Sequence, residues 1–456
     1  MPSPTFSQTL HLAPHAGPDR DHRGPAVPED DRLRRLLEGL ARRHGVPAAQ
    51  LAIHAGGRTR SVAVGGITAV AKFPVGSITK AFTAALAMLL VADGDLEPGD
   101  ALGEHLADLG PQVGRATVAQ VLSHTGGLPA ALGAAADSAG SARRYVRACR
   151  DAGLVQPPGQ GFSYSNVGYV LTGYLVEAIT GMSWWEAVDT LLLDALGIVP
   201  AFVVAPGSRR RAGTHVSGHA VHAATGRARP VAQTLSIVEA PAGALALSAG
   251  DLVEFGRMYC GGETPLPADL LDLMRRPVPG AEPFGLADGW GLGLAGYRGA
   301  DADWAGHDGT ADGTSCHLRV DHEHGRVVAL TTNAGTGSAL WVDLVGELRA
   351  AGLPVGDYEL PRDLDRATRP PADLSGSYTN GDLEYHVDVR ADGGAVLVVD
   401  GEVYPELAVL ANGSFSVREP GTGRRIVGGR FLTDPATGTV SAMQAGGRIA
   451  RRRKVS

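Results

Sequence analysis

A serine and a lysine three residues apart are the first residues in this sequence that could do chemistry together. Ser77 and Lys80 lie in Val75-Gly76-Ser77-Ile78-Thr79-Lys80, at the start of an apolar helical run that ends near Asp93. This spacing places both side chains on one helix face, and the free N–H groups at a helix start favour an oxyanion. A serine needs a base to become nucleophilic, and a lysine is such a base when burial lowers its pKa. The competing interpretation is a helix cap at Ser77 and a surface lysine.

A second motif, Tyr164-Ser165-Asn166, lies on the turn before the predicted helix Val167–Thr180. We expect Tyr164 to share a proton with Lys80, since a neighbouring amine and phenol titrate as a unit. Asn166 would orient Lys80 and a substrate amide. The alternatives are that Asn166 caps the helix and that Tyr164 packs in the core.

The third motif is Gly306-His307-Asp308-Gly309-Thr310, just before the predicted strand Ser315–Val320. Its glycines would let a substrate backbone approach closely. The backbone N–H of Thr310, together with that of Ser77, would form an oxyanion hole. The alternative is an ordinary glycine-rich turn with an exposed histidine.

Composition restricts the class of protein. The chain has 456 residues, of which 44% are hydrophobic and 20% charged, which is typical of a globular protein of two or three domains. The net charge of −7 gives no general attraction to nucleic acid. We find no apolar run of the length that spans a membrane, and the three cysteines suggest neither a disulfide framework nor a metal site. We therefore expect a cytoplasmic protein without nucleic-acid or membrane partners.

The pattern along the chain predicts two domains. Leucines at helical spacing predict a first helix beginning near Glu29–Asp31, and Ser315–Val320 with Arg326–Thr332 resembles a hairpin. After the proline-containing stretch Pro361–Pro371 the pattern becomes short strands separated by turns, which is typical of a small antiparallel barrel or sandwich. The predicted parts are a flexible N-terminal arm (1–30), a mixed α/β (α+β) catalytic domain (31–360), a linker (361–371) and a β domain (372–456).

The order and spacing of the three motifs resemble the serine β-lactamase / penicillin-binding-protein family, in its class C-like, esterase and D-aminopeptidase branch. The segments Val121–Pro129, PPGQGFSYSNVGYVLTGYLVEAITG and Ala240–Leu252 add to the resemblance. It implies an α/β sandwich with a helical subdomain and an acyl-enzyme mechanism without metal or cofactor. By this resemblance Ser77 is the nucleophile, Lys80 with Tyr164 is the base system and Asn166 assists. His307 and Gly309 form the third motif, where the β-lactamases and carboxypeptidases have lysine in place of His307.

A narrower resemblance rests on GHDGTADGTSCHLRVD, DGWGLGLA, ALTTNAGTGSALW and the tail ending GGRIARRR. These segments are similar to the stand-alone penicillin-binding-protein-type thioesterases that cyclise nonribosomal peptides and carry a C-terminal lipocalin-like domain. The resemblance implies a peptidyl thioester substrate, free or bound to a carrier protein of a nonribosomal peptide synthetase, whose last residue is usually D-configured. The peptide's own N-terminal amine would then release it as a head-to-tail lactam.

Three further residues are expected near the substrate. We predict that Asp308 and Arg448 pair across the domain interface and shape the pocket for the peptide terminus, and that Trp290 lines the cleft. The alternative for Arg448 is a solvated basic end of the chain.

Other functions remain open from the sequence. They are a hydrolase of the same family (esterase, D-aminopeptidase or β-lactamase-like), an amide-forming transacylase, and a non-enzymatic sensor with the β-lactamase fold.

Overall fold

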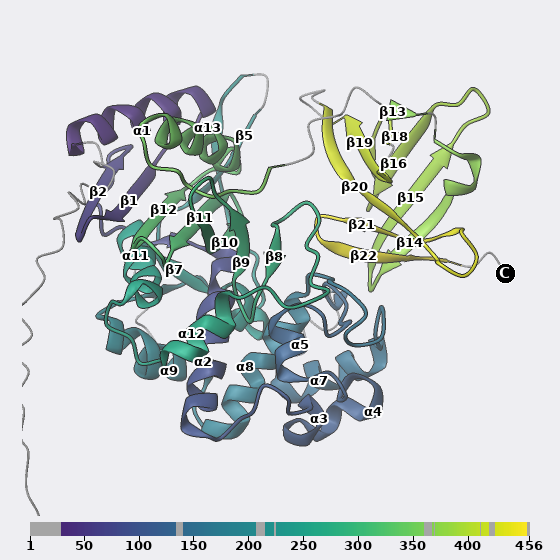
Figure 1. Cartoon of the computed structure of the whole chain (residues 1–456), viewed down its shortest axis with the longest axis horizontal. Coiled ribbons are helices and arrows are strands. Elements are labelled where there is room, and N and C mark those ends of the chain that lie inside the picture. The colour runs from purple at the N-terminus through teal and green to yellow at the C-terminus, as the bar shows by residue number, and fades with distance from the viewer. Residues whose placement is uncertain are drawn as a thin grey trace, which may run out of the picture.

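The structure is a computed structural model of the whole chain. It describes residues 29–133, 140–206, 215–222, 225–359, 367–368, 370–410, 412–418 and 425–453. All but the last two residues of the predicted N-terminal arm and most of the predicted linker therefore lie outside the described residues. A larger domain of mixed helices and strands stands beside a smaller C-terminal domain of strands (Figure 1).

A seven-stranded antiparallel sheet forms the centre of the larger domain, in the order β2-β1-β12-β11-β10-β9-β8. Side chains alternate between its faces. On β1 (Ala49–Ala55), Leu51 and Ile53 pack under α1 (Asp30–His44) and α13 (Gly337–Ala350), whereas Ala52 faces the core beneath α11 (Ala249–Arg257). The other strands are β2 (Arg58–Val64), β8 (Gly289–Trp290), β9 (Ala295–Arg298), β10 (Asp303–Ala311), β11 (Thr314–Asp321) and β12 (Arg326–Thr332).

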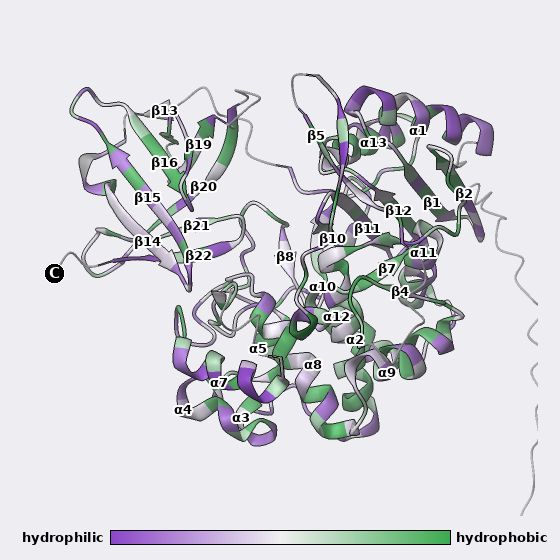
Figure 2. Cartoon of the chain, turned by 180° about the vertical axis from the view of Figure 1, so that it is seen from behind, coloured by the Kyte–Doolittle hydropathy of each residue, from purple (hydrophilic) through white to green (hydrophobic). Residues whose placement is uncertain are grey.

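The first helix, α1, confirms the leucine pattern. Leu33, Leu37 and Leu40 are buried, and the hydrophilic residues between them colour its outer face in Figure 2. Two aspartates occupy its first turn and three basic residues its last, so the charges complement the helix dipole. The helix ends at Gly45, whose φ of 64° suits glycine.

A helical subdomain packs below the sheet around two apolar helices, α2 (Thr79–Asp93) and α8 (Asn166–Thr180). By length and composition the segment Gly76–Asp93 is apolar enough to cross a membrane, but 72% of it is buried inside the protein, as in a core helix. The other helices of the larger domain are α3 (Leu102–His105), α4 (Gly110–Val113), α5 (Val118–Leu122), α7 (Ala142–Ala152), α9 (Trp184–Ala187), α10 (Ala240–Gly243) and α12 (Ala268–Arg275). Its short turns include η1 (Gly76–Ile78) and η5 (Ile237–Glu239), and its short strands are β3 (Phe73–Pro74), β4 (Ala201–Phe202), β5 (Gly218–Val221), β6 (Ala228–Val231) and β7 (Leu245–Leu247).

The C-terminal domain is one antiparallel sheet of ten strands that curls around its own core into a half-barrel (Figure 1). Tyr378, Phe415, Phe431 and Met443 fill that core. Among the described residues the two edge strands do not pair, so the barrel stays open, and its predicted lipocalin-like character stays a prediction. The strands are β13 (Ala367–Thr368), β14 (Gly376–Asn380), β15 (Leu383–Val389), β16 (Ala395–Val399), β17 (Glu402–Tyr404), β18 (Ala408–Leu410), β19 (Ser414–Arg418), β20 (Arg425–Thr433), β21 (Val440–Ala445) and β22 (Arg448–Arg452).

The turn between β21 and β22 reaches into the larger domain. The backbone N–H of Tyr164 donates to the Gly447 carbonyl oxygen at 2.9 Å. The Asn380 side chain accepts from the N–H of Ala130 at 2.7 Å and donates to the hydroxyl of Ser163 at 3.2 Å. The segment that carries Tyr164 is therefore held by the Gly447 backbone and the Asn380 side chain of the C-terminal domain.

Two of the alternatives raised by the sequence are ruled out by these elements. The motif around His307 is not a turn, because it lies inside β10, paired with β11 on one side and β9 on the other. Residues 448–452 are not a solvated end, since they form β22 within the C-terminal sheet. In addition, the C-terminal sheet begins with β13, a few residues before the predicted boundary at 372.

Candidate active site

Ser77 sits on the short turn η1, between β3 and α2. The preceding residue, Gly76, has φ of +51°, and a Cβ there would overlap the carbonyl of Thr310 on β10. Only glycine lets the turn approach the strand this closely. Gly76 therefore allows Ser77 to lie directly beside the third motif.

Lys80 lies one turn further along and points back at Ser77. Its Nζ donates to Ser77 Oγ at 3.0 Å and to the Ala242 carbonyl at 2.9 Å. The side chain is 1% exposed. Burial, with a contribution from the positive charge of Arg448, lowers the pKa of Lys80 to about 7. A large neutral fraction at neutral pH lets this amine accept the serine proton.

Tyr164 enters from the residues just before α8. The Lys80 ammonium nitrogen lies 5.2 Å from the centre of its ring. Burial raises the pKa of Tyr164 to about 12, although the hydrogen bond with Ser77 and the charge of Arg448 oppose the rise. Tyr164 is therefore a neutral phenol at pH 7 and would take part in a proton transfer as a hydroxyl, not as a phenolate.

Asn166 is the first residue of α8, and its cap is Ser165, whose hydroxyl accepts from the Gly168 N–H at 3.1 Å. The capping alternative for Asn166 is therefore wrong. Among the described residues, the Lys80 amine forms hydrogen bonds with Ser77 and Ala242 and none with Asn166. Asn166 lines a cavity beside these three residues.

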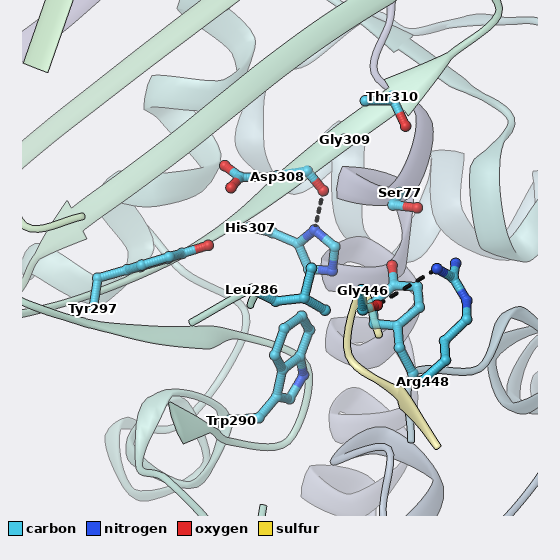
Figure 3. A pocket seen from close by; sticks show the side chains of 11 residues that line it. Ser77, Leu286, Trp290, Tyr297, His307, Asp308, Gly309, Thr310, Gly446 and Arg448 are labelled. Atoms are coloured by element: carbon cyan, nitrogen blue, oxygen red, sulfur yellow. Dashed lines mark hydrogen bonds between the residues drawn. The ribbon is translucent and has the colours of Figure 1, made fainter. Parts of the chain in front are cut away.

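His307 is 1% exposed and neutral. Its Nδ1 lies 2.6 Å from the carbonyl oxygen of Asp308, and since a carbonyl only accepts, Nδ1 carries the proton (Figure 3). Burial, with the nearby Lys80 charge, lowers the pKa of His307 to about 4. The other ring nitrogen, Nε2, is buried without a partner among the described residues and so offers an acceptor to a bound molecule.

Gly309 and Thr310 carry the strand past the serine. A Cβ on Gly309 would overlap the carbonyl oxygen of Val75, so glycine is needed for the same close approach. The sequence predicted that these glycines would make room for a substrate backbone. In the structure they make room for neighbouring backbone of the protein itself. Thr310 lines the space around Ser77 with Gly309, where an oxyanion hole is expected.

The expected ion pair between Asp308 and Arg448 is not formed. The Asp308 carboxylate instead bonds Arg319 at 2.7 and 3.1 Å and His317 at 2.8 Å. Burial by itself raises the pKa of Asp308, but the charges of Arg319 and His317 hold it well below its usual value. Arg448 lies over Tyr164, with Cζ 5.4 Å from the ring centre, on the side of Figure 3 away from the Asp308 carboxylate. The register explains this, because Asp308 directly opposes His317 on the neighbouring strand.

Two cavities meet at the serine, and among their described lining residues they share only Ser77 and Thr310. The first, of about 230 Å³, is walled mainly by apolar side chains, with Arg448 at one side (Figure 3). Trp290 lines it, as the sequence predicted. The second, of about 490 Å³, is polar and contains Lys80, Asn166 and Glu239.

Sequence reasoning missed several residues of this site. Its first cavity includes Leu286 and Tyr297, and its second includes Glu239. The pairing of Arg319 with Asp308 was also not predicted from the sequence. The signal was present, because Asp312-Gly313 is a typical two-residue hairpin turn and sets the register of the two strands that carry them.

His124 packs against the ring of Tyr164. Its ring centre lies 4.2 Å from that of Tyr164, and its Nδ1 accepts from the backbone N–H of Ser165 at 3.1 Å. Burial, with the nearby charge of Lys80, lowers the pKa of His124 well below its usual value. A neutral imidazole therefore supports the underside of the tyrosine.

Comparison with known proteins identifies the class. A family model described as Beta-lactamase matches residues 33–348, which is most of the chain. The chain belongs to the beta-lactamase family, whose members include serine hydrolases and acyltransferases, and the predicted membership is confirmed.

Individual relatives match most of the chain. Penicillin-binding protein 4 of Amycolatopsis lactamdurans is 31% identical over 75% of this chain and 95% of that protein. The crystal structure of SurE is 40% identical with a TM-score of 0.82, covering 93% of this chain and 99% of that one. A structure of SurE with D-Leu has a TM-score of 0.81 at 39% identity.

A more distant structure shares the fold alone. The D-amino acid amidase from Ochrobactrum anthropi SV3, in complex with L-phenylalanine, has a TM-score of 0.60 at 24% identity, covering 71% of this chain and 99% of that one.

Proposed function

We propose that this protein is a serine acyltransferase that takes a peptidyl group from a thioester onto Ser77 and releases it by head-to-tail macrolactamisation. The observation that carries the proposal is the 3.0 Å contact between Ser77 Oγ and the buried Lys80 amine. A neutral amine at this distance turns the hydroxyl into a nucleophile without a metal or a histidine base.

In the first half-reaction Ser77 Oγ attacks the thioester carbonyl carbon while its proton passes to Lys80. The backbone N–H groups of Ser77 and Thr310 stabilise the oxyanion. The carbon–sulfur bond breaks, and the sulfur receives the proton from Lys80 through Tyr164 and leaves as a thiol. A thiol needs little acid assistance to leave, which suits a neutral phenol in the relay.

In the second half-reaction the peptide's own amine attacks the Ser77 ester. The carbon–nitrogen bond forms, the ester bond to Oγ breaks, and the amine proton passes to Oγ through the same Lys80. The cyclisation proposal is supported by two cavities that meet at Ser77, one for each end of a folded-back peptide.

The acyl donor is proposed to end in a D-configured residue and to arrive as a free or carrier-bound thioester in the cytoplasm. Support comes from the likeness to SurE over 93% of the chain, both domains included, and from the SurE structure determined with D-Leu. The first cavity, with Leu286, Trp290 and Tyr297 in its wall, would take the side chain of that residue.

The second candidate is a hydrolase, in which water attacks the same acyl-enzyme. The family match and the 31% identity with a penicillin-binding protein favour it. Both candidates share the first half-reaction, so only the released product separates them.

The test is incubation with D- and L-terminated peptidyl N-acetylcysteamine thioesters, with products and intact protein read by mass. A cyclic product supports the proposal, a linear acid identifies the hydrolase, and a stoichiometric adduct that never turns over identifies a sensor. The matched control is Ser77→Ala, which should abolish both adduct and turnover. Consumption by Ser77→Ala at the parent's rate, with no adduct on the parent, overturns all three.

A further inference from the structure

The polar cavity beside Ser77 has a carboxylate in its wall that the first half-reaction does not use. Glu239 is half-buried there, and its negative charge reaches Lys80, whose affinity for a proton it increases. Two side-chain amides, Asn166 and Gln233, line the same space. Each of these groups has an oxygen that can accept a hydrogen bond, and all three line the cavity that includes Ser77.

The charged side chains of the two cavities differ. The first is lined by Arg448 and by Asp308, whose carboxylate is already paired with Arg319 and His317, whereas the second is lined by Glu239 and Asp312 beside Lys80. Arg448 would therefore repel a cation in the first cavity, and Glu239 would attract one in the second. A peptide amine is an ammonium ion at neutral pH before it reacts. Charge therefore assigns the amine end of the peptide to the cavity that holds Glu239.

The backbone on both sides of Glu239 is held by hydrogen bonds from other elements. The Tyr174 hydroxyl donates to the Val238 carbonyl at 3.0 Å, and the Thr83 hydroxyl donates to the Pro241 carbonyl at 2.7 Å. Lys80 itself donates to the Ala242 carbonyl. A site tied to α2 and α8 in this way is held in place relative to the reacting ester before the amine arrives.

We propose that this polar cavity is the amine-acceptor subsite and that the Glu239 carboxylate binds the N-terminal ammonium of the peptide, an assignment that rests on the proposed acyl transfer. The bound ammonium releases one proton to solvent, and the resulting amine attacks the carbonyl carbon of the Ser77 ester. The carbon–nitrogen bond forms, the ester bond breaks, and the second proton reaches Oγ through Lys80. Water lacks the charge that Glu239 attracts, so this carboxylate favours aminolysis over hydrolysis.

The experiment separates the amine step from acylation. The donor is an N-acetylated, D-Leu-terminated peptidyl N-acetylcysteamine thioester, which cannot cyclise. The acceptors are L-leucinamide, which is mostly cationic at neutral pH, and methoxyamine, which is not. The Glu239→Gln variant is compared with the parent and with Glu263→Gln, a control at an exposed residue. The ratio of amide to acid product is measured by mass spectrometry.

In Glu239→Gln we expect the amide-to-acid ratio to fall about tenfold with L-leucinamide, the loss typical of one charge-assisted hydrogen bond. The ratio with methoxyamine should stay unchanged, as should both ratios in Glu263→Gln. Glu239→Asp, which keeps the charge but shortens the reach, should fall between. Ser77 acylation by the thioester, seen by intact mass, shows that each variant is folded.

The outcomes distinguish the two levels of the proposal. If the parent forms no acyl-enzyme from the thioester, the proposed function fails. If the parent transfers the acyl group to L-leucinamide but Glu239→Gln and Glu239→Asp give the parent's ratio, only the amine subsite is wrong. An equal fall with both acceptors also overturns it, because the effect would not depend on charge.

Discussion

The carboxylate of Asp308 accepts two hydrogen bonds from the guanidinium of Arg319, at 2.7 and 3.1 Å. Arg319 is 1% exposed, donates at 2.6 Å to Asp357, and lies with Cζ 3.6 Å from the centre of the Tyr297 ring. Asp308, the residue after His307, is therefore tied into an ionic network around the buried Arg319 and not to the C-terminal domain.

Removing the cation should destabilise the larger domain. Arg319→Met leaves two carboxylates without their partner, and we expect a loss of about 3 kcal/mol, the low end for a broken buried pair, because Asp308 stays 43% exposed. Differential scanning calorimetry measures this as a lower Tm. Arg298→Met, at an exposed position on β9 of the same sheet, is the control and should melt with the parent. Equal melting of Arg319→Met would contradict the network's structural role.

The pH dependence of acylation should follow Lys80. Because only the neutral amine accepts the Ser77 proton, kcat/KM for thioester consumption should rise with pH and level off above about 7. Arg448→Gln removes a positive charge that lowers this pKa, so the inflection should move to higher pH. Arg451→Gln, on the same strand, should leave it unmoved. An inflection that does not move in Arg448→Gln would show that Lys80 does not limit the acid side of the profile.

Tyr164→Phe should slow acylation by about 10²- to 10⁴-fold, the usual contribution of a proton-transfer group. The pKa of Tyr164 near 12 keeps the hydroxyl neutral, so the parent should show no decline from its ionisation between pH 8 and about 10. Stopped-flow measurement of thiol release tests both statements. Acylation of Tyr164→Phe at the parent's rate would remove this residue from the relay.

The turn between β21 and β22 should matter more for activity than for stability. Gly447 has φ of +71°, and a Cβ there would overlap the Leu286 side chain. Gly447→Ala should therefore push the turn away from Tyr164 and lower kcat/KM by about tenfold or more. The control is Gly438→Ala, with a similar φ of +69° and open space around its Cβ, which shares the backbone strain alone. Equal activities of the two variants would contradict a turn that completes the site.

The sequence by itself determined the elements whose signals are local. The spacing of leucines predicted α1, and the apolar runs predicted α2 and α8. The hairpin of β11 and β12 was also predicted, since alternation and turn residues are read along the chain. The three sequence motifs also predicted which residues lie together around Ser77 in the structure.

Only the tertiary structure decided which way Asp308 and Arg448 point. Asp308 follows His307 in a strand, so their side chains alternate, and cross-strand pairing gives the carboxylate to His317 and Arg319. Arg448 reaches the cavity because a turn of a separate domain docks on the backbone of Tyr164. Glu239 is held in place because Tyr174 and Thr83, both far away in sequence, donate hydrogen bonds to backbone carbonyls on either side of it. Such contacts join segments tens to hundreds of residues apart, and no local pattern encodes which of them meet.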